Sequence, residues 1–430
     1  MATTYLTRTS WGTATNKQKF TQSFWVKRGV IGVQQALLGV ESGGNNEARV
    51  LFRTDDTLEF YDYQSGYTFR YITNRKFRDC SAWYNIVLRV DTDNGTAANR
   101  VRIYINGVQE TSFSTGTQPS RNLNTFYNSS GNHIVQIGRQ STGNSYFTGS
   151  MSHVNFCDGT TLAPTVFGST DATTGEWEGN TSPSVTYGTN GYFILKDGNS
   201  VTDQSGRGNN FTVGGGTLTN LKDNPDNVFC TMNALSKSLT NVVLSKGNTV
   251  VRNDANSNGN VLGTIALGNG KYYWENYRHG GGGPGLGLTL ASVDGSNHSA
   301  IHGSRVNYYS DGYIYQNGFG LSDINTGVSY GDTDIIGVSV DTENGTIKFY
   351  KNGALVANST QTNSVFTYSQ NELIPFWFVI NGGEWRTNLG NGYFGTTAVS
   401  SAGTNASGNG IFEYNVPSGF TALSTKGLNL

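Results

Sequence analysis

The sequence has 430 residues, a net charge of −1 and only 14% charged residues. A chain of this length exceeds one ordinary core and fits two domains, and its near-zero net charge gives no long-range attraction to nucleic acid or an anionic membrane. Its 57 glycines, 22 phenylalanines and 23 tyrosines predict an all-β protein with many turns, because glycine favours turns and aromatic residues favour strands.

The beginning of the chain lacks the apolar segment of a secretory signal peptide. No apolar run reaches the ~20 residues that a membrane-spanning helix needs. The cysteines Cys80, Cys157 and Cys230 are odd in number and widely spaced. We therefore expect reduced thiols in a protein that is made in a cytosol and does not insert into a membrane.

Residues 1–215 predict a series of short strands separated by turns. Apolar residues alternate in 20–27, and the further predicted strands are 35–40, 49–53, 57–61, 68–72, 133–138 and 149–156. The most apolar strand, 83–90, leads into a hairpin that contains Asn94-Gly95, a dipeptide that accepts positive φ at low cost. Short alternating strands at this spacing are typical of a β-sandwich.

Four motifs follow one another in this half: Trp83–Val87 (WYNIV), Val101–Gly107 (VRIYING), Ile137-Gly138 and Phe147–Met151 (FTGSM). With these motifs, residues 1–215 resemble the laminin G-like or concanavalin A-like family. The resemblance implies a jelly-roll fold and says little about the ligand.

Residues 157–227 are rich in Gly, Asn, Thr and Ser and carry aromatic landmarks such as Trp177, Tyr192 and Phe193. This connector resembles the segment that joins such jelly rolls to later modules in tailed-phage virion proteins. A low-complexity linker is the alternative. The regularly placed aromatic residues favour a folded segment, because aromatic side chains are usually buried.

Residues 228–430 predict a second sandwich built around the hairpin Asp334–Gly353, whose two strands flank Asn344-Gly345. The family motifs are Gly270–Glu275 (GKYYWE), Gly285–Leu288 (GLGL), Leu373–Trp377 (LIPFW) and Asn388–Gly390 (NLG, with Leu389 in place of the usual Phe). With these motifs this half resembles a SPRY domain. Its C-terminal extension, Phe412–Leu423, resembles an ending that follows SPRY modules in phage proteins. The fold class expected is all-β, with two tandem antiparallel β-sandwich domains.

No catalytic constellation is found, although the concanavalin-like fold includes glucanases. Retaining enzymes of that fold carry an E-x-D-x-E strand that places carboxylates on one face, and this sequence has none. Asp332 and Asp334 are two apart at a predicted strand entrance, where solvation in a turn is the better interpretation. We expect no enzyme activity and no catalytic residues.

No metal or cofactor is expected either. The five histidines show no compact ligand spacing, and the pair His298 and His302 falls in a Gly/Ser-rich predicted loop. Some jelly rolls of this family bind calcium through loop oxygens. Calcium therefore stays open, with no ligands assigned.

Candidate ligand-binding residues lie in predicted loops and turns. The SPRY resemblance implies binding through loops at one end of the sandwich, here 277–283, 308–315 and 381–385, and the candidates in or beside them are Tyr308, Tyr309, Tyr313, Asn381, Glu384 and Trp385. Their rings offer stacking faces for sugars, and the Asn381 amide offers hydrogen bonds to hydroxyls. A similar aromatic turn in the first half contains Tyr61, Tyr63 and Tyr67. The alternative is that Tyr313 alternates into a strand and is partly core.

The resemblances imply a surface protein of a tailed-phage virion, made in the host cytoplasm. One role is an adhesin, a tail-fibre or receptor-binding module that attaches to host-surface glycan or protein. The other is a structural or decorating component of head or tail. We find no heptad stalk, so we expect attachment to other virion proteins, with homo-oligomerisation open. A cellular SPRY protein that recruits cytoplasmic partners is a third reading.

Overall fold

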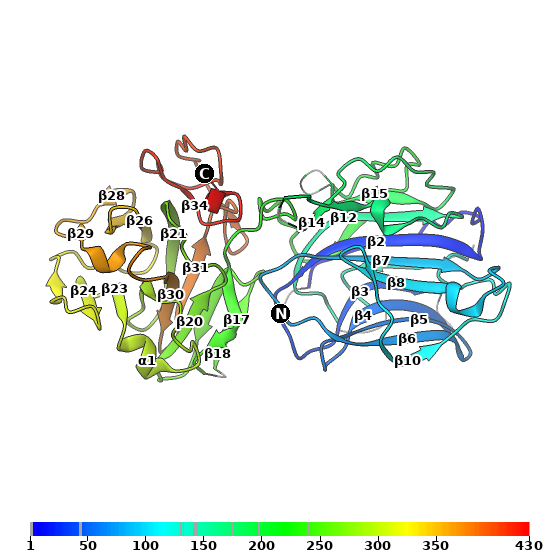
Figure 1. The fold of residues 1–430 in the computed structure, drawn as a ribbon, viewed down its shortest axis with the longest axis horizontal. Coiled ribbons are helices and arrows are strands. Elements are labelled where there is room, and N and C mark those ends of the chain that lie inside the picture. Colours follow the sequence, from blue (N-terminus) through cyan, green and yellow to red (C-terminus); the bar gives the residue numbers. More distant parts are fainter. Residues whose placement is uncertain are drawn as a thin grey trace. The chain divides into compact units, whose positions relative to one another are not determined.

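The computed structural model describes residues 3–42, 45–129, 131, 133–140, 145–173, 175–196, 198, 200–239 and 241–429. The chain divides into two compact units, Met1–Asn220 and Leu221–Leu430. Each unit contains two large, predominantly antiparallel sheets (Figure 1). The predicted all-β class with two sandwiches is confirmed. Within the described residues, no helix is long and apolar enough to cross a membrane.

Unit 1 consists of sheet A, with eight strands, and sheet B, with six. Sheet A has the order β10 (Phe113–Thr117), β6 (Tyr67–Lys76), β5 (Thr57–Gln64), β4 (Asn46–Phe52), β3 (Gln35–Glu41), β11 (Ile134–Ile137), β1 (Tyr5–Arg8) and β16 (Thr212–Gly215). Sheet B has the order β15 (Tyr192–Ile194), β12 (Gly149–Asp158), β2 (Lys19–Arg28), β7 (Tyr84–Asp91), β8 (Val101–Ile105) and β9 (Val108–Gln109). The remaining elements are the ribbon β13 (Gly168–Thr170) with β14 (Trp177–Gly179), and the 3-10 turns η1 (Ala97–Asn99) and η2 (Pro164–Val166).

Unit 2 consists of sheet C, with seven strands, and sheet D, with nine. Sheet C has the order β17 (Met232–Lys237), β20 (Gly259–Gly263), β30 (Leu373–Val379), β22 (Gly285–Leu290), β23 (Arg305–Tyr309), β24 (Tyr313–Asn317) and β25 (Ile324–Asn325). Sheet D has the order β18 (Val242–Ser245), β19 (Val250–Asn253), β31 (Gly383–Asn388), β21 (Lys271–Gly280), β26 (Ile335–Asp341), β27 (Thr346–Lys351) and β28 (Ala354–Leu355), with β29 (Gln361–Thr362) beside β27 and β34 (Thr421–Ala422) beside β21. The remaining elements are α1 (His298–His302), the ribbon β32 (Tyr393–Phe394) with β33 (Thr397–Ala398), and the 3-10 turns η3 (Ser364–Phe366) and η4 (Gly427–Asn429).

Both predicted long hairpins form, as β7–β8 and β26–β27. The tightest Asn-Gly turns, however, lie after these hairpins, where β8 connects to β9 (Val108–Gln109) and β27 connects to β28 (Ala354–Leu355). Both residues have positive φ in Asn106-Gly107 (48° and 77°) and in Asn352-Gly353 (50° and 79°). The connection that contains Asn94-Gly95 is longer and includes η1. The Asn-Gly signal is therefore strongest where the chain must reverse within two residues.

Alternating apolar residues fill the space between the sheets of unit 1. From β2, Phe20 and Phe24 are fully buried, and the Phe20 ring stacks on Tyr127 with centroids 4.5 Å apart. On β4, Val50 and Phe52 are likewise fully buried. The core forms because one face of each strand carries these side chains, as strand periodicity requires.

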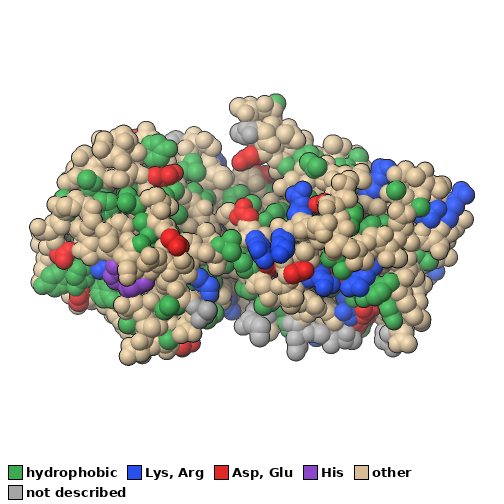
Figure 2. Space-filling model, turned by 60° about the horizontal axis from the view of Figure 1, so that its bottom comes forward, with side chains coloured by type: hydrophobic (Ala, Val, Ile, Leu, Met, Phe, Trp, Pro, Cys, Tyr) green, Lys and Arg blue, Asp and Glu red, His purple; other side chains and the backbone are tan. Residues whose placement is uncertain are grey.

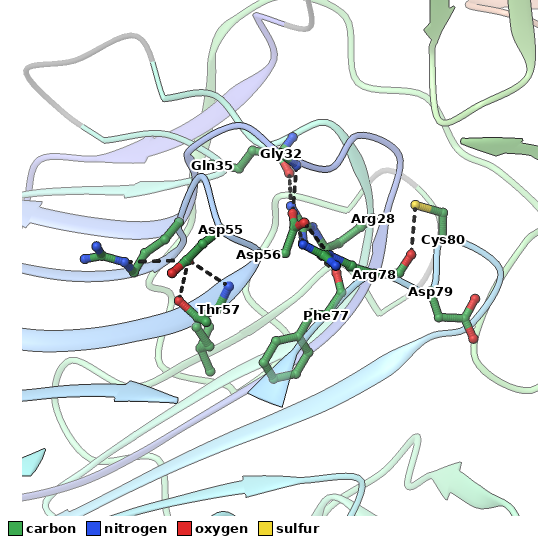
Figure 3. Close-up of polar contacts among 12 residues, drawn as sticks. Arg28, Gly32, Gln35, Asp55, Asp56, Thr57, Phe77, Arg78, Asp79 and Cys80 are labelled. Atoms are coloured by element: carbon green, nitrogen blue, oxygen red, sulfur yellow. Dashed lines mark hydrogen bonds and ion pairs between the residues drawn. The ribbon is translucent and has the colours of Figure 1, made fainter. Parts of the chain in front are cut away.

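Arg28, Asp56 and Arg78 form an ion cluster in unit 1 (Figure 3). Arg28 is 1% exposed, and its Nη1 donates to Asp56 Oδ1 at 3.1 Å and to the Phe77 carbonyl at 2.6 Å. Asp56 also accepts hydrogen bonds from the Gly32 N–H at 2.7 Å and from Arg78 Nε at 3.0 Å. Burial works to raise the pKa of Asp56, but these donors outweigh it and the pKa is lowered. The cluster therefore holds a buried arginine in its charged, paired form.

Buried carboxylates attach the segments that lie outside the sheets. In unit 1, Asp158 accepts the N–H groups of Thr15 at 2.8 Å and Asn190 at 3.1 Å, so residues far apart in sequence meet at one side chain. Asp203 accepts the N–H groups of Phe193 at 2.8 Å and Asn209 at 2.9 Å. These bonds hold the Gly/Asn-rich segment against unit 1 in an ordered path.

In unit 2, the chain after β31 returns to the outer face of sheet D. Glu275 on β21 is fully buried there and accepts the N–H groups of Glu413 and Tyr414, both at 2.8 Å. The ring of Phe412 packs edge-on against Tyr273, with centroids 5.2 Å apart. Burial raises the pKa of Glu275 to about 7, although the two N–H groups and the Tyr273 hydroxyl favour the ionised form.

We predict that Glu275 makes unit 2 less stable as the pH rises from about 4.5 to 7. Its folded pKa is above its unfolded value, so the folded state binds the proton more tightly. The resulting stabilisation is fully present below the unfolded pKa and is lost as the pH rises through the folded pKa. Its full size is roughly 3 kcal/mol. Urea unfolding of the wild type and of Glu275→Gln between pH 4 and 8 measures this. The difference between their unfolding free energies should change with pH, and a constant difference would contradict the assignment.

Candidate functional site

The first candidate site is the tyrosine cluster, defined as Tyr61, Tyr63 and Tyr67 on β5 and β6. Strand alternation turns Tyr61 and Tyr63 to the outer face of sheet A while Phe60 enters the core. Tyr67 packs edge-on against both, with ring centroids 5.4 Å from Tyr61 and 5.2 Å from Tyr63. The structure thus brings together all three tyrosines predicted in this turn.

Exposure assigns these tyrosines different roles. Tyr61 is only 4% exposed and donates its hydroxyl hydrogen to Glu47 Oε1 at 2.6 Å. Burial, and then this bond, raise the pKa of Tyr61. Tyr67 is 46% exposed, and the guanidinium carbon of Arg70 lies 4.5 Å from its ring centroid. Tyr61 therefore supports the cluster from below, while Tyr67 and the half-buried Tyr63 present rings to solvent.

Paired charges surround the cluster. Arg70 Nε lies 2.7 Å from Glu59 Oε1, and Arg49 pairs with Glu41 at 3.3 Å and with Glu47. Figure 2 shows basic, acidic and hydrophobic side chains interspersed on the visible face of unit 1. Aromatic rings beside fixed charged donors and acceptors suit a ligand that is apolar on one face and hydroxylated at its edge.

The loop candidates of unit 2 do not form one site. Trp385 and Tyr308 are both fully buried in the core. The indole N–H of Trp385 lies 3.2 Å from the Gly285 carbonyl, and the Tyr308 hydroxyl donates to the Val328 carbonyl. The expectation that these two rings stack on a ligand is therefore corrected: strand alternation turns them inward.

The other four candidates lie on three different surfaces. Tyr309 and Tyr313 are on the outer face of sheet C, the former half-buried and the latter 37% exposed. Asn381 is exposed in the turn between β30 and β31, with φ of 49°. Glu384 belongs to sheet D, is 8% exposed and pairs with Arg386 at 2.6 Å. Only Tyr309 and Tyr313 share a face.

Sequence reasoning missed the histidines of α1. His298 and His302 are four residues apart, so they lie on the same face of the helix, and their ring centroids are 3.9 Å apart. The available signal was Asn297, whose side chain accepts the Ala300 N–H and caps the helix. No group of three or more His, Cys, Asp or Glu able to hold a metal ion occurs among the residues that the structure describes.

Comparison with known proteins identifies both domain types. Residues 2–167 match the laminin G model of the concanavalin A-like lectin/glucanases superfamily, and residues 271–392 match the SPRY domain. The chain thus carries a concanavalin A-like domain followed by a SPRY domain, two classes that point to carbohydrate or protein binding. No curated protein matches the chain.

Three similar solved structures illustrate the level of similarity. The SPRY domain of human HERC1 is 18% identical over 36% of this chain and 96% of its own, with a TM-score of 0.27. The PSpry domain of TRIM65 is 14% identical over 36% and 87%, with a TM-score of 0.29. Domain 4 of AbnA, an arabinanase from Geobacillus stearothermophilus solved with arabinotriose, is 17% identical over 34% and 64%, with a TM-score of 0.27. Similarities at this level do not identify a ligand for this chain.

We predict that Trp385→Ala destabilises unit 2 by about 3–5 kcal/mol, because it opens a cavity in a closed core. Tyr313→Ala, on the surface, should change the unfolding free energy by no more than about 0.5 kcal/mol. Urea unfolding followed by circular dichroism measures both. An unchanged midpoint for Trp385→Ala would contradict the burial of that side chain.

Proposed function

We propose that the protein is a non-enzymatic adhesin on the surface of a tailed-phage virion, and that the tyrosine cluster of unit 1 contacts glycan or protein on the host surface. The observation that carries the proposal is the cluster itself, in which the 46% exposed Tyr67 is held by two other tyrosines and Arg70. Rings fixed in this way lose little conformational freedom when a ligand binds.

The virion assignment is supported by resemblance. The connector 157–227 and the ending 412–423 resemble segments of tailed-phage virion proteins. In this proposal the partners are other virion proteins, the host receptor and further copies of the chain. Neither nucleic acid nor a cofactor has a role in it.

A structural or decorating role is the second candidate, favoured by the edge of sheet A. The last strand of that sheet, β16, pairs only with β1 within the sheet, and its Val213 is 44% exposed. An exposed strand edge can add a strand from another protein. Here unit 1 would bind a neighbouring virion protein through β16.

We predict that Tyr67→Ala weakens binding to host cells by about three- to tenfold, because one aromatic contact contributes ~0.5–1.5 kcal/mol beyond the area it buries. Binding of the purified, labelled protein to host cells measures this. Tyr368→Ala is the matched control, since Tyr368 is 47% exposed on unit 2, away from the cluster in sequence. Equal binding by Tyr67→Ala and the wild type would exclude the tyrosine cluster as the contact surface.

We predict that antibodies against this protein label intact particles at the tail and block adsorption. Electron microscopy of labelled particles and an adsorption assay measure the two effects. Label on the head with adsorption unchanged would instead support the decorating role. Absence of the chain from purified particles would contradict both roles and favour a cellular SPRY protein.

A further inference from the structure

A polar and aromatic patch lies on the outer face of sheet C. Strand alternation places Arg305, Asn307 and Tyr309 of β23 on this face, while Val306 and Tyr308 enter the core. From β24, Tyr315 lies beside Asn307 in the strand register. Figure 2 shows histidine side chains on the visible surface of unit 2, next to hydrophobic and basic ones. We name Arg305, Asn307, Tyr309, Tyr313 and Tyr315 the β23 patch.

Arg305 in this patch is buried and makes no ion pair with the described residues. It is 7% exposed, and no carboxylate oxygen of the described residues lies within 4.0 Å of its guanidinium nitrogens. Its Nε has no hydrogen-bond partner in the described part of the chain, while Nη1 lies 2.7 Å from His302 Nε2. A buried guanidinium normally faces an anion.

Two acids lie near the patch. Burial lowers the pKa of Arg305 and outweighs the charge of Asp323, which favours the charged form of Arg305. Asp311 Oδ2 accepts the Tyr315 hydroxyl at 2.9 Å, and Asp323 Oδ1 accepts the Gln316 N–H at 2.9 Å. Burial, and then the charge of Arg305, lower the pKa of His302 to about 3, so this histidine is neutral near pH 7. Arg305 therefore supplies the positive charge of the patch.

Asn307 adds unused hydrogen-bonding groups. Its side chain is fully buried, and neither its Nδ2 nor its Oδ1 has a partner among the residues that the structure describes. On β20, which is separated from β23 by β30 and β22, the Oδ1 of the fully buried Asn260 also has no partner among the described residues. Buried amides are nearly always hydrogen-bonded. The patch thus offers donors and acceptors that a ligand carrying both an anion and hydroxyls would satisfy.

Aromatic rings run across the patch in a continuous row. Ring centroids are 5.4 Å apart between Phe378 and Tyr309, 5.7 Å between Tyr309 and Tyr315, and 5.9 Å between Tyr315 and Tyr313. The row crosses β22 at Gly285, where an added Cβ would lie 2.6 Å from Tyr309 Cδ2. Glycine at this position is what lets the ring lie flat on the strand.

We propose that the β23 patch binds a carboxylate-bearing sugar, with the carboxylate on Arg305, the sugar ring on the tyrosines and hydroxyl groups on Asn307. A guanidinium binds a carboxylate through paired hydrogen bonds. Because Asn307 is covered, the ligand reaches it after the Tyr309 or Arg305 side chain rotates, and the exposed Tyr313 makes the first contact. This site is separate from the tyrosine cluster of unit 1 and does not rest on the adhesin proposal.

The test titrates the full chain with glucuronate, glucose and inorganic sulfate, followed by NMR. Glucuronate and glucose differ only at C6, so the ratio of their dissociation constants measures the contribution of the carboxylate. We expect glucuronate to bind at least tenfold more tightly than glucose. Arg305→Gln should remove that preference, and Tyr313→Ala should weaken glucuronate binding by about three- to tenfold.

Two further variants make the test independent of folding losses. Asn307→Asp is nearly isosteric and gives Arg305 a carboxylate of its own, so it should abolish glucuronate binding. Tyr368→Ala, an exposed tyrosine outside the patch, should leave the binding unchanged. The proposal is overturned if glucuronate binds no better than glucose, or if Asn307→Asp retains it. The assignment of a sugar ligand is also overturned if sulfate binds as tightly as glucuronate and Tyr313→Ala does not weaken that binding. The patch would then be a simple anion site.

Discussion

The structure depends on buried carboxylates that accept backbone N–H groups from distant parts of the chain. Asp158 joins Thr15 to Asn190, and Glu275 holds Glu413 and Tyr414. A hydrogen bond to a charged group contributes about 1.5–3 kcal/mol, and removal of the acceptor leaves a buried N–H unpaired. Such bonds replace the sheet ladder where the chain has no regular strand. They let Gly/Asn-rich segments of low strand propensity follow a defined path over the sandwiches.

Two of the buried arginines, Arg28 and Arg305, show how differently a charge can be accommodated. Arg28 of unit 1 meets Asp56, the Phe77 carbonyl and the face of Phe52, whose centroid is 4.4 Å from the guanidinium carbon. Arg305 of unit 2 is 7% exposed and has no such carboxylate in the described part of the chain. A buried charge left without a counter-ion costs stability. Arg8 is also buried, but the Asn190 carbonyl at 3.2 Å and Asn209 Oδ1 at 2.5 Å accept its hydrogen bonds. Arg305 instead meets a neutral histidine, which is why we assign its charge to a ligand.

Much of the architecture was predictable from the sequence because strand alternation and Asn-Gly turns are local signals. The candidate sites were harder to predict. Their residues were assigned to loops, and the alternation of inward and outward side chains along a strand was not applied to them. In β23, Val306 is apolar and must face inward, so Tyr308 faces inward and Arg305 faces outward. The same parity in β31 turns Trp385 into the core beside the outward pair of Glu384 and Arg386. The contact between His298 and His302 depends on the short helix α1, for which the capping residue Asn297 was the one local signal in a Gly/Ser-rich segment.

Both candidate surfaces lie on sheet faces, which sets how each would bind. In the tyrosine cluster, Tyr67 is already exposed and held by neighbouring rings, so a ligand meets a surface that needs no rearrangement. In the β23 patch, Asn307 is covered, so the binding-competent arrangement is a minor population of the free protein. Its apparent affinity is reduced by that population. The first surface therefore suits rapid, low-specificity contact, whereas the second suits slower and more selective recognition.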